Sequence, residues 1–308
     1  MNPPFVQANT NGRLHAADEP SLSPLNRGFL YGDAIYEVWR TYDGVLFAWE
    51  AHWERLLRSA TALHLPIPWT PEHILSEIRR TAGAFRDRTG ETGELYVRLQ
   101  VTRGAGPIGL DPGLAEAPDF VILVQPCRKL SEDQLANGLR LSIARELRRN
   151  PTDALSPAWK TGNYLNNILC LHEARARGAD EVVMLNREGE ITEAAVANLG
   201  FVRDGKVITP PSETGILQGV TRRLLLESVA PAAGIPFAEA VVRPDDLPAM
   251  TECFLMSTTR DLVPVGSIDS VKFATGPETI TRRLKQAFAD WAAASAREHP
   301  DRALGGSD

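Results

Sequence analysis

The segment AIYEVWRTYDGVLFAW, residues 34–49, constrains the fold more than any other part of this 308-residue chain. It places Asp43-Gly44 between two apolar runs, and an Asp-Gly pair in that setting is a strong signal for a tight β-hairpin. The later segments ELYVRLQVTRG and DFVILVQPCRKL alternate or run apolar in the manner of strands. The first half of the chain is therefore expected to contain one sheet built from these strands.

Two helices are expected between the hairpin and the later strands, over residues 50–63 and 71–85, because apolar residues recur there at helical spacing. The polar stretch after Pro126, which ends at Gly138, breaks the pattern and is the candidate linker. The predicted division is a small α/β domain over residues 1–126, a linker over residues 127–137 and a larger domain over residues 138–308.

The second half is expected to be rich in strands. The segment LRLSIARELR predicts a strand, and the loop RRNPTDALSPAWKTGN separates it from a helix over residues 164–176 that stops at Gly178. A helix at TRRLLLESVAPAAG and an amphipathic helix over residues 278–295 are predicted near the end, and the tail after Glu298 is expected to fray. Further strands are predicted at EVVMLN, EITEAA, NLGFVRDG, KVITP and CFLMSTT.

The composition excludes several classes of partner. The chain has a net charge of -6 and therefore lacks the excess of positive charge that nucleic-acid binding needs. No stretch approaches the roughly 18 apolar residues of a membrane span, and the N-terminus has no apolar segment behind a basic start. The cysteines lie far apart, in neither a metal-ligand spacing nor a disulfide framework. We therefore predict a cytoplasmic protein without a metal site, and its cysteines are Cys127, Cys170 and Cys253.

Lysine is scarce in this chain, so a reaction that needs a primary amine has few candidates. Arginine is no substitute, because its guanidinium stays protonated. Lys160, in AWKTGNYL, lies between an irregular loop and a predicted helix, where its amine either lines a cavity or lies on the surface. Tyr164 follows one helical turn later. The lysines are Lys129, Lys160, Lys206, Lys272 and Lys285.

Other polar residues occur where an anionic cofactor would need them. Glu193 lies on a predicted strand, where it is either solvated or faces a cationic ring nitrogen. A glycine-containing loop runs into a helix at Thr221. The start of this helix either binds a phosphate or has Thr221 as an ordinary N-cap. The hydroxyl cluster at residues 257–259 is either a turn or a second wall of the same cradle. Arg55 and His52 share one helix face.

An amine, a carboxylate, a phenol and a phosphate cradle are together what pyridoxal phosphate requires of a protein. The ordered motifs resemble the class IV aminotransferases, the fold type IV pyridoxal-phosphate enzymes, over nearly the whole chain. This resemblance implies an α/β (α+β) fold with a small N-terminal α/β domain and a larger C-terminal pseudo-barrel domain, usually as a homodimer. The motifs are NRGFLYGDAIYE, HWERL, YVRLQVTRG, KTGNYLNN, EITEAAVANLGF, GILQGVTRR and FLMSTTRDLVPV.

The resemblance also implies roles for individual residues. Lys160 would form the Schiff base and shuttle a proton, Glu193 would face the pyridine nitrogen, and Tyr164 would lie near the ring hydroxyl. Tyr31 is expected to reach the neighbouring pocket across the dimer interface. The other implied cofactor-binding residues are Arg55, Leu217, Gly219, Val220, Thr221, Ser257 and Thr258. The implied substrate-binding residues are Tyr31, Tyr36, Val38, Arg40, Tyr96, Arg98, Thr258 and Thr259.

The pocket residues are similar to two branches of the family. Tyr96-Val97-Arg98, Arg40 and the loop GAGPIGLDP are similar to branched-chain L-amino acid transaminases, although Arg103 departs from that pattern. Val38 and the cluster at residues 257–259 are closer to D-amino acid transaminases. We expect a branched-chain L-amino acid as donor and a 2-oxo acid such as 2-oxoglutarate as acceptor.

Three alternatives remain beside this expectation. A D-amino acid or R-amine transaminase would use the same cofactor residues. An aminodeoxychorismate lyase would carry out an elimination with the same Lys160. The third is a binding-only relative, which the joint presence of Lys160, Glu193 and Tyr164 disfavours.

Overall fold

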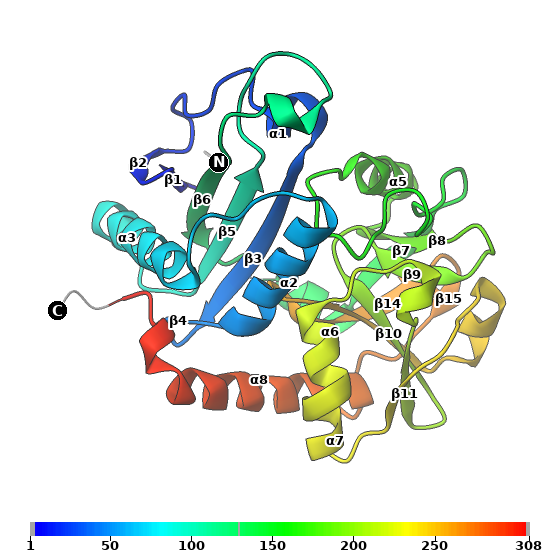
Figure 1. Ribbon diagram of the computed structural model, residues 1–308. Coiled ribbons are helices and arrows are strands. Elements are labelled where there is room, and N and C mark those ends of the chain that lie inside the picture. Colours follow the sequence, from blue (N-terminus) through cyan, green and yellow to red (C-terminus); the bar gives the residue numbers. More distant parts are fainter. Residues whose placement is uncertain (1–3, 129, 306–308) are drawn as a thin grey trace. The chain divides into compact units, whose positions relative to one another are not determined.

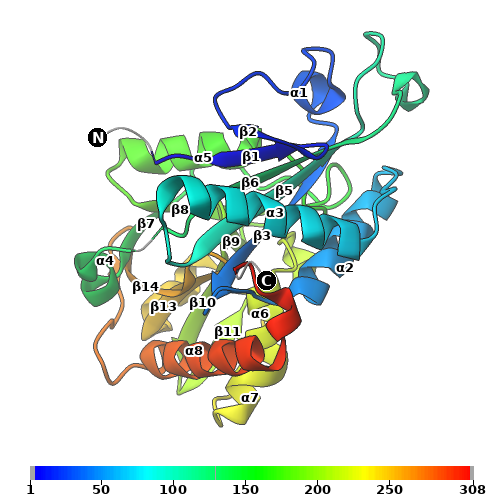
Figure 2. The same ribbon diagram turned by 90° about the vertical axis from the view of Figure 1, so that its left-hand side faces the viewer.

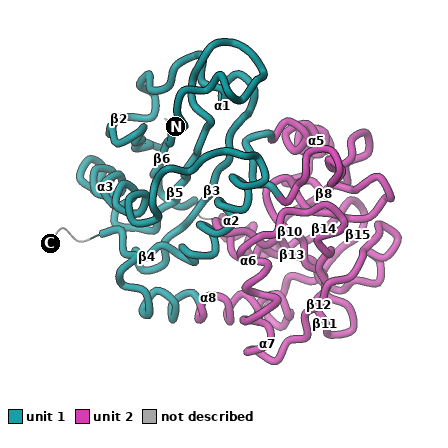
Figure 3. The backbone as a smooth tube through the Cα atoms, in the orientation of Figure 1, with its two compact units in different colours: residues 1–128, 159–163, 292–308 teal, residues 129–158, 164–291 magenta. Residues whose placement is uncertain are grey.

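The computed structural model of the chain describes residues 4–128 and 130–305. The chain divides into two compact units, of which unit 1 spans residues 1–128, 159–163 and 292–308 and unit 2 spans residues 129–158 and 164–291 (Figure 3). Lys129 and the outermost residues of the predicted domains and tail, 1–3 and 306–308, lie outside the described residues.

Unit 1 is built on an antiparallel sheet whose described strands follow the order β2-β1-β6-β5-β3-β4 (Figure 1). The predicted hairpin is confirmed, because Asp43 and Gly44 have φ angles of 50° and 76°, as a type I′ turn requires. The predicted strands of the first half share one sheet, whereas β1 and β2 were not anticipated. The strands are β1 (Gln7–Thr10), β2 (Arg13–Ala16), β3 (Ala34–Tyr42), β4 (Val45–Leu46), β5 (Leu95–Thr102) and β6 (Asp119–Pro126).

One face of this sheet carries the apolar core of unit 1. Helix α2 (Trp49–Ala62) packs on β3, and helix α3 (Pro71–Thr89) lies along β1 and β6 (Figure 2). Helix α3 has its ends defined locally, by the Thr70 side chain that accepts from His73 N and by left-handed Gly90. The short helix α1 (Arg27–Tyr31) lies between β2 and β3 in the sequence.

The compact units differ from the predicted division in residues 159–163 and 292–308, which were predicted in the larger domain and belong to unit 1. Residues 159–163 return to unit 1, where Ile35 and Thr161 form a bridge beside β3. The expected fraying after Glu298 is wrong for the described part of the tail, because Leu304 is buried at 2% exposure. Arg79 Nε and Arg86 Nη1 donate to the carbonyls of Ala303 and Leu304 at 3.2 and 2.9 Å, so the tail's backbone has partners.

Unit 2 is built on a mixed, curled sheet, with the described strands in the order β12-β11-β10-β13-β14-β7-β8-β9 and β15 paired to β14. Strand β9 lies at the end of this order yet directly precedes β10 in the sequence, and Ala194 N donates to Ala197 O at 2.8 Å between them. The sheet must therefore curl. The strands are β7 (Leu139–Ile143), β8 (Glu181–Leu185), β9 (Ile191–Ala194), β10 (Asn198–Arg203), β11 (Lys206–Thr209), β12 (Phe237–Glu239), β13 (Glu252–Ser257), β14 (Asp261–Ile268) and β15 (Val271–Lys272).

The helices of unit 2 include one that the sequence did not predict. The segment expected to be a linker contains α4 (Glu132–Asn137), which begins with a capping box between Ser131 and Gln134. Helix α6 continues through a π-helical turn, Leu225–Val229, into α7. The other helices are α5 (Leu165–Ala176), α6 (Val220–Leu224), α7 (Ala230–Ala232) and α8 (Ile280–Glu298), of which α8 extends into unit 1.

Candidate functional site

The backbone around Lys160 is held against the start of β3. Tyr36 N donates to Lys160 O at 3.0 Å, and Gly162 N donates to Ala34 O at 3.1 Å. Lys160 N also donates to Ser59 Oγ of α2 at 3.1 Å. The side chain is half-buried, so the structure does not place Lys160 as a fully exposed surface lysine.

The amine of Lys160 lies beside an aromatic ring. Its Nζ is 3.3 Å from Tyr36 Oη and 4.3 Å from the centre of the Tyr36 ring. The guanidinium carbon of Arg98 lies 3.8 Å from the same ring centre, and Arg98 Nη2 donates to Gln100 Oε1 at 2.7 Å. Lys160 and Arg98 therefore both make cation–π contacts with Tyr36.

The substrate-binding residues that we predicted on β3 and β5 share one face of the sheet. Val38 pairs with Arg98 and Arg40 pairs with Tyr96 across the two strands. Side chains alternate along a strand, so this face is opposite the one that carries Glu37 and its contacts with α2. The Arg40 guanidinium lies 4.3 Å from the Tyr42 ring centre on the same strand. The predicted substrate-binding residues on this face are Tyr36, Val38, Arg40, Tyr96 and Arg98.

Tyr31 lies apart from this group, on α1. Its hydroxyl oxygen accepts from Gly109 N at 3.1 Å, and the Arg27 guanidinium lies 5.1 Å from its ring centre. Arg27 also donates to the Gly109 and Leu110 carbonyls at 2.7 and 3.1 Å. Tyr31 is thus fixed to the loop GAGPIGLDP.

Arg55 belongs to a buried charged cluster and not to a solvated helix face. Its Nε and Nη2 donate to Glu37 at 2.7 and 2.8 Å, and His52 Nδ1 lies 2.8 Å from the same carboxylate. Burial alone raises the pKa of Glu37, but the charge and hydrogen bonds of Arg55, followed by those of His52, hold it far below the usual range. Burial lowers the pKa of His52, and the attraction of Glu37 only partly offsets this.

Arg103 serves the scaffold of unit 1. Its Nε donates to Asp33 Oδ2 at 2.7 Å, and its terminal nitrogens donate to the carbonyls of Leu63 and His64 at 2.9 and 2.8 Å. Burial raises the pKa of Asp33, but the hydrogen bonds of Arg103 and Arg27 outweigh it and the net shift is downward.

Glu193 occupies a buried position on β9 of unit 2. Arg149 Nε and Nη2 donate to its Oε1 at 3.1 and 2.8 Å. Asn198 Nδ2 and Leu217 N donate to its Oε2 at 3.2 and 3.0 Å. The carboxylate is thus an anchored group, and the predicted cofactor residues Glu193 and Leu217 are in direct contact. Sequence reasoning missed Arg149, which nothing in the motif RRNP distinguishes from Arg148.

The loop before α6 joins the same group of residues. Gly219 is the N-cap of α6, and a Cβ added there would lie 2.1 Å from Asn198 Oδ1, so only glycine fits without displacing Asn198. Thr221 is not the N-cap. It is 2% exposed, and its Oγ1 has no hydrogen-bond partner among the described residues. A buried hydroxyl without a partner is unusual and is available to hydrogen-bond a bound water or ligand.

The hydroxyl cluster at residues 257–259 is the turn between β13 and β14. Ser257 pairs with Asp261, and Arg260 N donates to Ser257 O at 3.3 Å, so Thr258 and Thr259 lie at the tip. Arg260 Nη1 lies 3.6 Å from Glu181 Oε2, and burial raises the pKa of Glu181. Tyr164 is the N-cap residue of α5 and makes no side-chain cap there.

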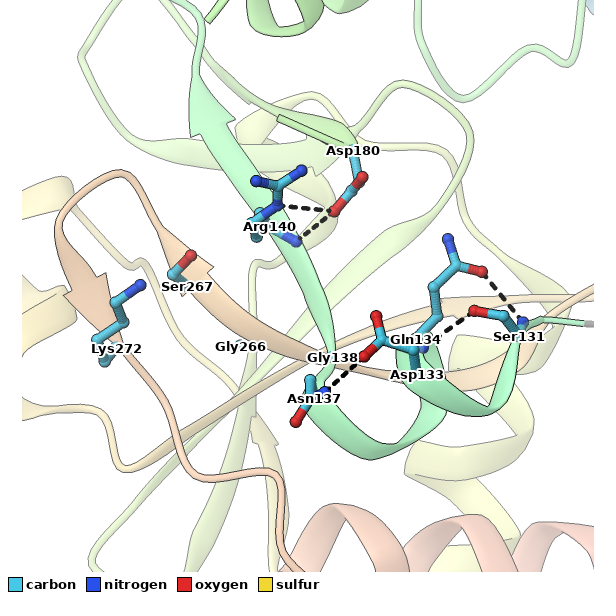
Figure 4. A pocket seen from close by; sticks show the side chains of 10 residues that line it. All are labelled: Ser131, Asp133, Gln134, Asn137, Gly138, Arg140, Asp180, Gly266, Ser267 and Lys272. Atoms are coloured by element: carbon cyan, nitrogen blue, oxygen red, sulfur yellow. Dashed lines mark hydrogen bonds and ion pairs between the residues drawn. The ribbon is translucent and has the colours of Figure 1, made fainter. Parts of the chain in front are cut away.

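A separate groove of about 580 Å³ lies on unit 2, and none of the predicted site residues lines it. Its side chains are largely paired locally, as Arg140 with Asp180 and Asn137 with Asp133 (Figure 4). Among the described residues we find no helix suited to crossing a bilayer and no cluster of three or more His, Cys, Asp or Glu placed to hold a metal.

Comparisons with known proteins agree on one family. The profile of amino-transferase class IV matches residues 34–268. The chain is 35% identical over 283 residues to a putative branched-chain-amino-acid aminotransferase of Methanocaldococcus jannaschii, covering 91% of this chain and 94% of that protein. It is 30% identical over 279 residues to the D-alanine aminotransferase of Bacillus licheniformis, covering 90% and 94%.

Solved structures show the same likeness. The branched-chain aminotransferase of Thermoproteus uzoniensis with norvaline superposes with a TM-score of 0.86 at 29% identity, covering 98% of this chain and 100% of that one. The branched-chain amino acid aminotransferase of Escherichia coli superposes with a TM-score of 0.83 at 27% identity, covering 92% and 93%. A further branched-chain amino acid aminotransferase, with pyridoxamine 5'-phosphate in its structure, superposes with a TM-score of 0.84 at 25% identity, covering 98% and 99%.

Proposed function

This chain belongs to the class IV aminotransferase family, and we propose that it moves the amino group of a branched-chain L-amino acid to a 2-oxo acid such as 2-oxoglutarate. Its activity class is aminotransferase, and the family's cofactor is pyridoxal phosphate. The fold type IV architecture expected from the motifs agrees with the structural neighbours. The observation that carries the proposal is the contact of Lys160 and of Arg98 with Tyr36, which lies on the sheet of unit 1.

The residues of unit 2 fit the cofactor. Thr221 Oγ1, which has no described partner, and Gly219, which has no Cβ, leave room and a donor for a phosphate beside the start of α6. The carboxylate of Glu193, held by its hydrogen bonds, suits a protonated ring nitrogen. We propose that Lys160 supplies the amine, Glu193 faces the ring nitrogen and Tyr164 lies near the ring hydroxyl. The phosphate and the remaining contacts are assigned to Arg55, Leu217, Gly219, Val220, Thr221, Ser257 and Thr258.

When bound, pyridoxal phosphate supplies an aldehyde that condenses with amines and a ring that accepts electrons from the substrate Cα. In this proposal Nζ of Lys160 would accept the proton from the substrate Cα and deliver it to the carbon that carried the aldehyde. Tyr36 keeps the freed amine in place through its hydroxyl and ring. A second 2-oxo acid reverses the exchange, so ping-pong kinetics are expected.

Arg98 is the proposed receptor for the substrate carboxylate. Its guanidinium is fixed between the Tyr36 ring and the amide oxygen of Gln100, so it is already oriented before substrate binds. Tyr36, Val38, Arg40 and Tyr96 lie on the same sheet face as Arg98 and are the other proposed substrate-binding residues of unit 1. Thr258 and Thr259 are proposed to contribute from the β13–β14 turn.

A D-amino acid is the second candidate donor. Two observations favour it: the likeness to D-alanine aminotransferases at 30–31% identity, and Val38, where branched-chain enzymes typically have glycine. Val38 lies on the same sheet face as Tyr36 and Arg40, where its side chain replaces the hydrogen of a glycine.

A homodimer and a cytoplasmic location are part of the proposal. On unit 1, Phe29, Ile108 and Leu110 of α1 and the adjoining loop are each more than three-quarters exposed, and on unit 2 Leu165, Ile168 and Leu169 project from one face of α5. Exposed apolar groups of this size are typical of protein–protein contacts. Tyr31 lies beside the first group and is proposed to reach the partner subunit's pocket.

Half-reactions with single amino donors test the proposed function. The purified protein is mixed with L-leucine, D-alanine or R-phenylethylamine, and the visible absorption band of the bound cofactor is followed. Loss of the band with L-leucine is the expected result, and reaction with D-alanine alone would replace the first candidate with the second. A colourless protein, or a band that persists in Lys160→Ala, would contradict the assignment of Lys160.

A further inference from the structure

Arg149 contacts Glu193 directly and has no part in the reaction as proposed so far. Its Nε and Nη2 lie 3.1 and 2.8 Å from Glu193 Oε1. The two side chains are 10% and 6% exposed, so the contact is largely shielded from water. A buried ion pair of this kind is costly to form unless both partners are well hydrogen-bonded.

Arg149 is itself held in place from two sides. Its backbone N donates to Leu185 O at 2.8 Å. Its Nη1 donates to Asn167 Oδ1 at 3.1 Å, and the amide nitrogen of the buried Asn167 donates to Ala195 O at 2.8 Å. The guanidinium therefore has a fixed orientation toward Glu193.

The other oxygen of Glu193 is bonded by neutral groups. Asn198 Nδ2 and Leu217 N donate to Oε2 at 3.2 and 3.0 Å. The described donors therefore contact both oxygens of the carboxylate. Of these donors Arg149 alone carries a positive charge. It is therefore the group that stabilises Glu193 as a buried anion.

We propose that Arg149 is a positioning residue that determines where the proton shared by Glu193 and the cofactor's ring nitrogen lies. This inference rests on the proposed function, in which Glu193 faces that nitrogen. A proton on the carboxylate would remove the negative charge that faces the guanidinium of Arg149, which is unfavourable. With the proton on the ring nitrogen, the carboxylate stays negative and lies between the two positive groups. Arg149 therefore keeps Glu193 an anion and the proton on the nitrogen, the form in which the ring accepts electrons best.

The test is the ¹⁵N chemical shift of the holoenzyme loaded with pyridoxal phosphate labelled at the ring nitrogen, recorded at neutral pH. Wild type should give the signal of a protonated pyridine nitrogen. Arg149→Met removes the charge at similar length and should move the signal toward that of an unprotonated nitrogen, while Arg149→Lys should restore most of the shift. The matched control is Arg148→Met, because Arg148 is exposed and its side chain donates only to backbone carbonyls among the described hydrogen bonds.

An Arg149→Met protein that is folded by circular dichroism, binds the cofactor and keeps the wild-type signal would overturn the inference. Equal shifts in the Met and Lys variants would do so too, because the charge would then not matter. If Arg149→Met does not fold, Arg149→Gln replaces it with the same expected direction. Failure of the proposed function is distinguishable, since Glu193→Gln would then leave the wild-type signal unchanged.

Discussion

The hydroxyl oxygen of Tyr36 lies 3.3 Å from Nζ of Lys160, and the backbone N of Tyr36 donates to Lys160 O at 3.0 Å. One residue of β3 thus positions both the main chain and the amine of the proposed catalytic lysine. The same tyrosine ring carries the Arg98 guanidinium at 3.8 Å. The proposed proton shuttle and the proposed carboxylate receptor are therefore organised around one side chain.

Tyr36→Phe removes the hydroxyl and keeps the ring with its two cation–π contacts. We expect kcat to fall about tenfold, since a hydrogen bond to a charged group contributes roughly 1.5–3 kcal/mol and the ring retains part of the positioning. KM should change little. Steady-state kinetics at saturating acceptor measure both constants. A raised KM with unchanged kcat would show that Tyr36 acts on substrate binding and not on Lys160.

Arg98→Ala should raise KM for amino acids by at least about tenfold, because a charge-assisted contact to the carboxylate is lost. Simple amines such as R-phenylethylamine have no carboxylate and should be almost unaffected. Arg88→Ala is the control, because Arg88 is exposed and lies 4.2 Å from the Phe5 ring centre. Equal effects of Arg98→Ala on both substrate types would remove Arg98 from this role.

Glu37 should make the apoprotein sensitive to acid. Its folded-state pKa is depressed, since the charge and hydrogen bonds of Arg55 outweigh the opposing effect of burial. The ionised group therefore contributes stability that is fully present above about pH 4.3, the unfolded value, and is lost as the pH falls below it. Urea unfolding across this range should show a steep loss of the free energy of unfolding in wild type.

Glu37→Gln should cost about 3–5 kcal/mol at neutral pH, because it leaves Arg55 buried without its counter-charge. The free energy of unfolding should then fall less steeply toward acid pH than it does in wild type. Glu54→Gln, at an exposed position of α2 next to Arg55, is the control and should change neither quantity. If the two glutamine variants behaved alike, the buried cluster would not be the source of the acid sensitivity.

Thr221→Val separates cofactor binding from folding. Thr221 Oγ1 is buried without a described partner, so the variant should unfold at the same or higher urea concentration as an apoprotein. Its Kd for pyridoxal phosphate should rise about tenfold, the equivalent of one lost hydrogen bond. Fluorescence titration of the apoprotein measures this constant.

Thr209→Val is the contrasting control for that experiment. Thr209 Oγ1 donates to Leu199 O at 2.7 Å and accepts from Arg222 Nε at 3.2 Å, so its loss should destabilise the apoprotein by about 1–3 kcal/mol. Affinity for the cofactor should stay unchanged. A Thr221→Val apoprotein that is destabilised and yet binds the cofactor normally would make Thr221 a structural residue.

Elements with local sequence signals were predictable without the structure. Asp43-Gly44 specified its hairpin through two positive φ angles, and Thr70 specified the start of α3 through its cap. The end of α3 was predicted at residue 85, whereas the helix continues to Thr89, before left-handed Gly90. Strand β14 was not predicted, because it contains Pro264 and Gly266, which disfavour a strand in the sequence pattern. In the structure it pairs with β13. Its pairing depends on partners distant in sequence, which no local pattern contains.

Which polar side chains meet depends on how distant segments pack in the folded chain. Lys160, Glu193 and Thr221 were identifiable from ordered motifs, but the contact of Glu193 with Arg149, 44 residues away, was not. The physical reason is that a buried charge must find a counter-charge or hydrogen-bond donors, and the available ones are set by strand register and packing between distant segments. Motif spacing therefore indicated the chemistry, while the folded chain supplied the partners that hold it in place.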